Sequence, residues 1–529
     1  NYQINWMYLR YMGWNFIGRQ NDLQGGIENR KNGNVLFGIN AIDEARGIIP
    51  QADLPEQRAN NMGKNKFYGL PFLLIILGAL YHFRKRWDDG LIVGLLVFFT
   101  GIAIVIFLNQ YPFQPRERDY AFAGSVYALC IWVGFGVLAI YDFLKNKVDG
   151  KVAAIAAAVV GVFAAPYLMG SEGWDDHDRS GRYAAKDYGV NYLESCAENA
   201  ILFTQGDNDT YPLWYAQEVE EIRTDVRIVN LSLLAVDWYI DFLRKSITEK
   251  DNSVPFSMEP SMYRGEKRDL VTYYAGNKMS KNFDMKKHYP VKSVMNVIKS
   301  DKYKTQGDRH VFPTKKMAIP VDFDAIRKYN VIPEDKMQLA DSVIRWTYPK
   351  TSIYKNDLMT LDLIAHMDWS RPIYFAVSVS PDAFCGLQSY FRLEGLAYRL
   401  TPIRGRGGKY EFGSIDVDRM YHNLMNKFKW GEVDRAERMY LDESLMRMCL
   451  NLRIQFAKLA TELIKLGRNE EAIKALDKCM AGLPEHNVRY GSVMAQFADL
   501  YLKAGAIDKG EALAKRLDEL YSEKMEYYI

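Results

Sequence analysis

Four consecutive charged residues, Arg116, Glu117, Arg118 and Asp119, interrupt a strongly apolar part of the chain. Segments long enough to cross a bilayer lie on both sides, so these charges are expected at a membrane surface. A charge at that boundary is costly unless it is solvated, paired or bound to a ligand. Arginine presents a planar fork of donors that matches phosphate oxygens. The run therefore predicts a site for a lipid-linked phosphate; the alternative is an interfacial ion-pair network.

A second candidate site follows the apolar segment 200–204, which is expected to be a strand. Asp207 and Asp209 come directly after it, at the end of a strand where ligands bind in open α/β sheets. The next helix would offer free amide donors there. Carboxylates could also bind a hard metal ion, but these two supply too few ligands, so no cofactor is expected. The alternative is a simple helix cap at Asp209 or Thr210.

Two further clusters carry side chains that can move protons or bind anions. Asp176 and His177 follow the last apolar segment, and a histidine beside carboxylates can be a general base or a metal ligand. Arg19 and Asp22 end an aromatic and polar stretch that predicts an interfacial helix followed by a turn. All four are candidate substrate-binding residues. The alternative for the Asp176 cluster is a solvated junction.

The apolar part of the chain must position these groups. It predicts four transmembrane helices, each near the length that crosses about 30 Å of hydrocarbon. The second and third contain no charged residue. The predicted spans are Phe67 to Phe83, Gly90 to Leu108, Ala121 to Tyr141 and Val152 to Gly170.

The short connectors predict the orientation. Basic residues lie between spans one and two and between spans three and four, which favours the cytoplasmic side for both connectors. The charged loop and all residues after 170 would then face outward. The expected location is the cytoplasmic membrane, with large extracytoplasmic domains.

The remainder of the chain is polar enough to be water-soluble. Apolar runs at 200–204 and 226–234, joined by a helix at 211–222, predict a parallel strand pair with a right-handed crossover. A helix at 358–366 and a strand at 371–379 extend this pattern, whereas residues 250–316 are expected to be extended loops.

The last hundred residues show another pattern. Small and large residues recur twice at the spacing of tetratricopeptide helical hairpins. The fold class is therefore a membrane-anchored multidomain protein with a helical transmembrane bundle, an α/β domain and helical repeats. The expected domains are an interfacial segment at 1–66, the membrane helices at 67–170, the α/β domain at 171–430 and the repeats at 431–529.

Composition excludes some classes of function. The formal charge of +3 over 529 residues gives no support for nucleic-acid binding. The five cysteines are scattered and match no metal-ligand spacing.

Four motifs resemble one family, the bacterial branch of the transmembrane protein O-mannosyltransferase-like glycosyltransferases. They are Gly18–Asp22, Gln114–Tyr120, Trp174–Ser180 and Gly206–Tyr215. The resemblance implies a multi-span C-type architecture and a sugar donor carried on a polyprenyl phosphate. It also implies transfer to hydroxyl groups of exported proteins, with Arg116 and Arg118 holding the lipid phosphate and the outer domains presenting the acceptor. In that architecture a catalytic acid lies in the first outward loop, which is expected upstream of this chain.

A non-catalytic function stays open beside the transferase. The helical hairpins could recruit partners in a secretion or surface assembly, which would make the chain a membrane-anchored scaffold.

Overall fold

A computed structural model describes residues 2–23, 31–48, 50–51, 54–111, 118–247, 252–274, 283–284, 286–305, 309–407 and 412–528. The fold mixes helices and sheets and divides into two compact units. The first unit contains Asn1–Ser180, Tyr440–Glu443 and Lys515–Ile529, and the second contains Gly181–Met439 and Ser444–Ala514. The four-domain division expected from the sequence stays a prediction.

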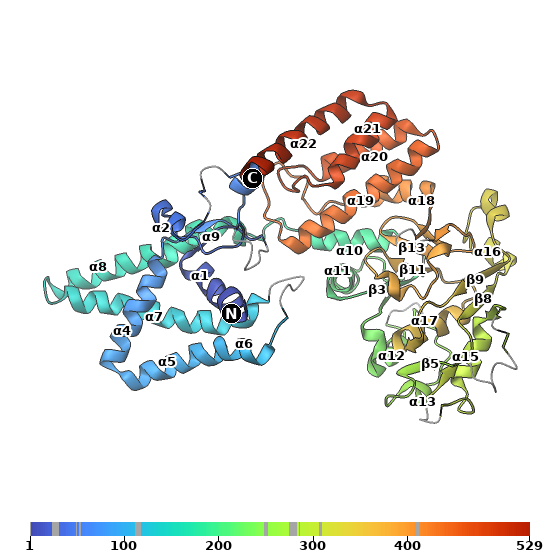
Figure 1. Cartoon of the computed structure of the whole chain (residues 1–529), viewed down its shortest axis with the longest axis horizontal. Coiled ribbons are helices and arrows are strands. Elements are labelled where there is room, and N and C mark those ends of the chain that lie inside the picture. Colours follow the sequence, from blue (N-terminus) through green and yellow to red (C-terminus); the bar gives the residue numbers. More distant parts are fainter. Residues whose placement is uncertain are drawn as a thin grey trace. The chain divides into compact units, whose positions relative to one another are not determined.

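Three helices of the first unit are long and apolar enough to cross a membrane: Trp87–Leu108, Asp119–Leu144 and Gly150–His177. The first joins α5 (Trp87–Thr100) to α6 (Ile102–Leu108). The second consists of a 3-10 turn (Asp119–Phe122) and α7 (Ala123–Leu144), and the third begins with α8 (Gly150–Val162) and ends with α9 (Leu168–His177) (Figure 1). The first predicted span is also a helix, α4 (Leu70–Lys85), but it has only 16 residues. A fourth span stays a prediction.

Proline shapes the third long helix. Pro166 lies inside a π-helical turn, Phe163–Tyr167, between α8 and α9. Proline lacks the amide hydrogen that an α-helix needs at this point, and a π turn accommodates that loss. The helix therefore continues to His177 and carries Asp176 within its last turn.

Glycines allow α4 and α7 to pack closely. A methyl group at Gly78 would overlap the carbonyl oxygen of Trp132, and one at Gly136 would overlap that of Leu74. Small residues at such positions let two helix backbones approach, which is a common basis of helix association in membranes. Ile75, Leu129 and Trp132 fill the adjoining core together with Phe16.

Segments far apart in sequence complete the first unit. The N-terminal part contains a π-helical segment (Tyr2–Leu9), α1 (Arg10–Phe16), β1 (Gly18–Arg19), α2 (Asn40–Ala45), α3 (Glu56–Ala59) and β2 (Asn65–Lys66). β1 pairs with β2 in an antiparallel ladder. The C-terminal part of α22 (Ile507–Tyr528) joins them through an ion pair of 2.8 Å between Arg516 and Glu56.

A mixed sheet forms the core of the second unit. Within the described residues its strand order is β14-β15-β12-β13-β11-β3-β4. The bounds are β3 (Ile201–Thr204), β4 (Arg227–Asn230), β11 (Ile373–Ala376), β12 (Phe391–Leu393), β13 (Ala397–Leu400), β14 (Arg406–Gly407) and β15 (Phe412–Ile415).

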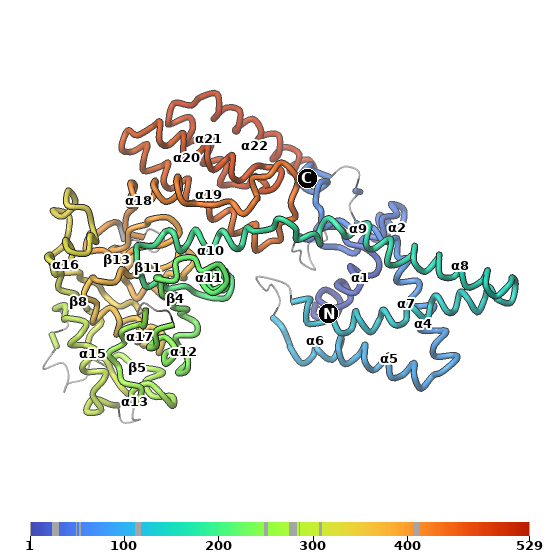
Figure 2. Tube along the Cα trace, turned by 180° about the vertical axis from the view of Figure 1, so that it is seen from behind, coloured from blue at the N-terminus to red at the C-terminus, as the bar shows by residue number. Residues whose placement is uncertain are grey.

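The predicted parallel pair is confirmed. β3 pairs in parallel with β4 and also with β11, and α11 (Asp207–Glu218) connects β3 to β4. Phe203 and Phe375 lie opposite each other on neighbouring strands, and their ring centroids are 4.8 Å apart. Figure 2 shows α10 (Ala184–Glu194) and α11 beside these strands.

Residues 250–316 were expected to be extended loops, and that prediction is wrong. They contain β5 (Leu270–Tyr273), β6 (Tyr289–Pro290), β7 (Val311–Phe312), α13 (Pro260–Tyr263) and α15 (Val291–Lys299). α15 buries Val291, Val294, Met295 and Ile298, which recur at the spacing of one helix face. Many polar residues around this short helix hid its period in the sequence.

Two small sheets and several helices complete the second unit. The strands are arranged β10-β5-β7 and β6-β8-β9 in the described part of the chain. The bounds not yet given are β8 (Lys316–Pro320), β9 (Val343–Thr347), β10 (Ser352–Tyr354), α12 (Asp237–Leu243), α16 (Phe323–Lys328), α17 (Lys355–Ala365) and α18 (Val417–His422).

The C-terminal helices of this unit are α19 (Glu443–Lys465), α20 (Asn469–Gly482), α21 (Val493–Ala504) and the start of α22. Ala460, Leu463 and Ala472 are buried, as the hairpin spacing predicts. Gly467 and Gly505 have φ of 73° and 92° at the ends of α19 and α21, which is a conformation that favours glycine. The tetratricopeptide assignment itself stays a prediction.

The close packing of α4 on α7 gives a test. Gly78→Ala should reduce stability by about 1–3 kcal/mol, because the added methyl group forces two backbones apart. The measurement is the thermal unfolding of the protein in detergent micelles. Gly134→Ala, in the partner helix α7, is the control because nothing lies within 4 Å of the added group. Equal effects of the two substitutions would contradict the packing described here.

Candidate functional site

The charged loop is partly described. Arg116 and Glu117 lie outside the residues that the structure describes, whereas Arg118 and Asp119 lie at the start of the second long helix. The Asp119 carboxylate accepts a hydrogen bond of 3.0 Å from the amide of Tyr120. A negative charge in the first turn is also favoured by the helix dipole.

The N-terminal helical segment lies against both ends of this loop. Gln3 Nε2 donates to the carbonyl oxygen of Gln110 at 2.8 Å, before the loop. Tyr8 shares a buried hydrogen bond of 2.5 Å with Ser125 Oγ, after the loop. Burial and then the nearby Asp119 carboxylate raise the pKa of Tyr11, whereas Arg19 acts in the opposite direction. The charges of both Asp119 and Arg19 therefore act on Tyr11.

Arg19 and Asp176 form a buried ion pair. The Asp176 side chain is only 1% exposed and receives the Arg19 guanidinium. Arg19 Nε also donates to the carbonyl oxygen of Gly63 at 2.7 Å, which fixes the arginine side chain. Two motifs that are far apart in the sequence thus meet at the end of the third long helix.

Asp176 also orients His177. The Nδ1 atom of His177 lies 2.8 Å from Asp176 Oδ1 and 2.7 Å from the carbonyl oxygen of Gly173. Both partners are acceptors, so we assign the ring hydrogen to Nδ1, which leaves Nε2 as the basic nitrogen of the neutral ring. The His177 side chain is 73% exposed. A histidine oriented by a buried carboxylate and open on its other nitrogen can accept a proton from a substrate.

Asp22 belongs to the same cluster. Its carboxylate accepts hydrogen bonds from Asn61 Nδ2 at 2.8 Å and from the Tyr440 hydroxyl at 2.9 Å. Burial and then the Asp22 charge raise the pKa of Tyr440, so this hydroxyl keeps its proton and donates. Tyr440 was not predicted from the sequence, because it lies 418 positions from its partner.

Asp207 and Asp209 lie in the second unit, directly after β3 as predicted. Asp207 is exposed, whereas Asp209 is partly buried and accepts a hydrogen bond from Ser378, which follows β11. Ser378 also bonds to the Tyr192 hydroxyl at 3.1 Å. The ends of two parallel strands therefore meet at this edge, as the crossover topology requires.

The helix-cap alternative for Asp209 or Thr210 is wrong. The residue before α11 is Gly206, with φ of 83°, and no side chain caps the helix. Thr210 instead bonds to Thr204 at 2.8 Å and receives Asn230 Nδ2 at 2.9 Å. Among the described residues, no group of three or more histidine, cysteine, aspartate and glutamate side chains could hold a metal ion.

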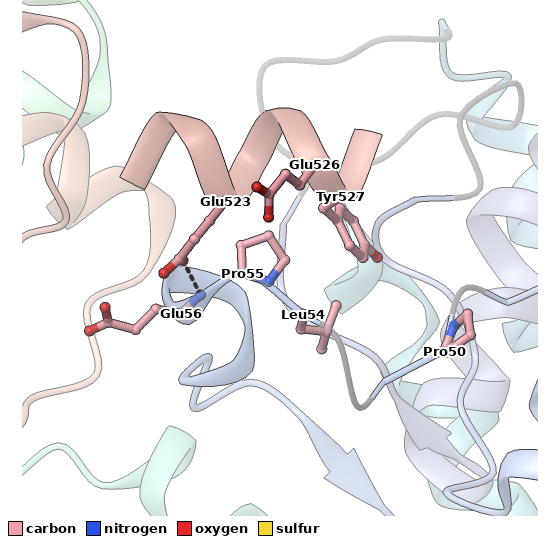
Figure 3. Close-up of a pocket in the computed structure, with 7 residues that line it drawn as sticks. All are labelled: Pro50, Leu54, Pro55, Glu56, Glu523, Glu526 and Tyr527. Atoms are coloured by element: carbon pink, nitrogen blue, oxygen red, sulfur yellow. Dashed lines mark hydrogen bonds between the residues drawn. The ribbon is translucent and has the colours of Figure 1, made fainter. Parts of the chain in front are cut away.

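A cavity of about 610 Å³ lies in the first unit (Figure 3). Glu56, Glu523 and Glu526 line it together with Tyr527. The amide of Glu56 donates to the Glu523 carboxylate at 3.0 Å. Three carboxylates would repel a phosphate, so this cavity does not suit the anionic part of a lipid-linked donor.

The Arg19–Asp176 pair gives a test of the first cluster. Arg19→Met should cost about 3 kcal/mol or more of folding stability, because it leaves a buried carboxylate without its cation. Arg19→Met combined with Asp176→Leu should recover much of that loss in thermal unfolding. Arg86→Met is the control, since Arg86 forms an exposed pair with Asp89 at 2.7 Å and should cost less than about 1 kcal/mol. A double variant no more stable than the single one would contradict this account.

Asp209 gives a second test. Burial raises its pKa, so the folded state holds the Asp209 proton more tightly than the unfolded state does. The favourable contribution of this group is therefore present at acid pH and is lost as pH rises through the folded pKa. Asp209→Asn should thus raise the melting temperature relative to the native chain more at pH 7 than at pH 4. Asp207→Asn, at an exposed neighbouring position, should show no such pH dependence; a matching dependence in both variants would disprove this assignment.

Comparison with known proteins adds one relationship. Residues 185–419 match the family model of TMEM260-associated domain 2. The match covers less than half of the chain and includes the mixed sheet with Asp207, Asp209 and Ser378. No curated protein and no solved structure matches the chain.

Proposed function

We propose that this chain is a membrane glycosyltransferase, or its C-terminal part, that transfers a sugar from a polyprenyl-phosphate-linked donor to hydroxyl groups of exported proteins. The supporting observation is His177, oriented by buried Asp176 at the end of a helix of membrane length. The match to TMEM260-associated domain 2 supports the same relationship, because TMEM260 is protein O-mannosyltransferase-like.

The reaction needs two kinds of group at the membrane surface. In the proposed transfer, the acceptor hydroxyl oxygen bonds to the anomeric carbon while the bond from that carbon to the donor phosphate breaks. His177 Nε2 takes the hydroxyl proton, and Arg116 and Arg118 bind the departing lipid phosphate. Glu117 and Asp119 would orient these arginines, and Asp176 orients the histidine. Arg19 pairs with Asp176, and Asp22 supports the same cluster through its hydrogen bonds to Asn61 and Tyr440.

The proposed topology has four spans in the cytoplasmic membrane, including α4. Leu73, Ile76 and Leu80 of α4 are exposed in the structure, as expected for side chains that face lipid. The basic connectors after α4 and α7 would lie in the cytoplasm. The polar cluster around Asp176, the α/β domain and the C-terminal helices would lie outside, where Asp207 and Asp209 would contact the acceptor.

A scaffold function is the second candidate. It is favoured by α19–α21, whose predicted small positions are buried as in helical repeats that bind partner proteins. A scaffold would need neither His177 nor Arg118. Substitution of these two residues can therefore distinguish the two functions.

Substitution of these two residues tests the proposal. Arg118→Ala and His177→Asn should each reduce sugar on exported proteins at least about tenfold, because one removes a phosphate ligand and the other a proton acceptor. The measurement is mass spectrometry of exported glycopeptides from cells that carry only the variant. Arg86→Ala, which replaces another exposed arginine beside a predicted span, should leave glycosylation unchanged.

The level of inserted protein must be equal in all strains. Unchanged glycosylation in both variants at equal protein levels would exclude the proposed roles of Arg118 and His177 and favour the scaffold. Cysteine labelling at residue 111 or 120 from the cytoplasmic side alone would also contradict the proposal, because the charged loop would then face the wrong compartment.

A further inference from the structure

A second cavity, of about 630 Å³, lies in the second unit at the amino ends of two parallel strands. Ser195 to Glu198 precede β3 and Ser370 and Pro372 precede β11, and all of them line it. Asp209 lies at the opposite, carboxyl ends of these strands. The volume falls within the range of roughly 300–1,000 Å³ that is usual for small-molecule sites.

Beside this cavity, guanidinium groups outnumber the buried carboxylates that could pair with them. Glu394 is 3% exposed and receives Arg419 Nη1 at 2.9 Å and the Tyr374 hydroxyl at 2.5 Å. Arg399 Nη1 is a further 3.6 Å from the same carboxylate oxygen. Two guanidinium groups therefore share one carboxylate, and that carboxylate already has two closer donors.

Arg399 is the arginine of this group whose hydrogen-bond donors are poorly paired. Its residue is 2% exposed, it lines the cavity, and its Nε has no hydrogen-bond partner among the described residues. A buried guanidinium is costly unless its donors are paired. Register places Arg399 beside Arg392 on β12 and Tyr374 on β11, all on one face of the sheet.

Arg392 does not relieve the excess of positive charge. It pairs with Asp416 at 3.2 Å, while its Nε and Nη1 have no partner in the part of the chain that the structure describes. The three arginines Arg392, Arg399 and Arg419 thus face two buried carboxylates. Nearer the rim, Lys427 pairs with Glu194 at 3.6 Å and Asp418 with Arg468 at 2.6 Å, so those charges are offset.

The rest of the cavity lining is largely polar and includes the exposed carboxylate of Glu198. His422, Ser370 and Asn423 line the cavity, and Tyr329 adds an aromatic ring that is 37% exposed. Hydroxyl and amide groups beside an exposed aromatic ring suit a ligand with several hydroxyl groups.

We infer that this cavity binds a small sugar that carries one anionic group, a carboxylate or a phosphate, and that Arg399 is the principal ligand of that group. An anion would supply the missing partner of Arg399 and balance the excess of guanidinium groups over buried carboxylates in this cluster. The planar arginine fork accepts either anion bidentately. This binding site does not depend on the proposed transfer reaction.

Binding to the full chain in detergent micelles tests this inference. The probes are glucuronate, glucose 6-phosphate and neutral glucose, followed by isothermal titration calorimetry. At least one anionic sugar should bind at least about tenfold more tightly than glucose, and its binding should weaken as salt is raised. The tighter of the two anionic probes identifies the anion.

One substitution in the cavity and one control outside it extend the test. Arg399→Met should weaken binding of the anionic sugar at least about tenfold. Its control is Arg227→Met. Arg227 is also buried, and its Nε and Nη1 have no hydrogen-bond partner among the residues that the structure describes, but it does not line the cavity, so its replacement should leave binding intact.

His422→Glu tests the cavity without disturbing the buried cluster. His422 is exposed, so the variant should fold, and its added carboxylate should repel the anionic probe, whereas His422→Gln should retain binding. Absence of binding by either anionic sugar would overturn the inference. Glucose binding as tight as that of the anions, or undiminished binding in His422→Glu, would also overturn it.

Discussion

Burial of the Asp176 carboxylate is the constraint on which the first unit depends. A carboxylate with 1% of its side chain exposed must find compensating charge and donors, because the free-energy cost of burying it alone is several kcal/mol. Arg19 supplies the charge, and the short β1–β2 ladder positions that arginine. His177 then takes the second carboxylate oxygen, so one buried group both anchors the N-terminal strand and orients an exposed imidazole.

Some of this could be predicted from the sequence, since it depends on local pattern. Uncharged apolar runs marked the long helices, and two apolar runs around a helix marked the parallel pair β3–β4. The Arg19 and Asp176 motifs were each recognised as sites, but their contact was not. No periodicity relates residues 157 positions apart, so such pairs emerge only from tertiary structure.

Other features could not be predicted from the sequence, because charged residues that are usually exposed are buried here. Glu394, Arg399 and Arg392 would be assigned to the surface from their charge alone, yet they lie inside the mixed sheet. Asp209 was expected to be a helix cap or a ligand, whereas its environment is a hydrogen bond to Ser378 from another strand. Polar residues at the ends of parallel strands, such as Ser378 and Asn230, could have indicated the hydrogen-bond partners at this edge of the sheet. The local sequence pattern does not distinguish them from other polar residues in loops.

The arrangement of the first unit also affects the order in which its contacts can form during synthesis. Tyr440 and the stretch from Arg516 to Tyr527 contribute to it, although nearly all its other residues precede position 181. Domains generally fold as they leave the ribosome, beginning with those made first. Here Tyr440, which donates a hydrogen bond to Asp22, and Arg516, which pairs with Glu56, are synthesised hundreds of residues after their partners. These contacts of the first unit can therefore form only after the intervening sheet of the second unit has been translated.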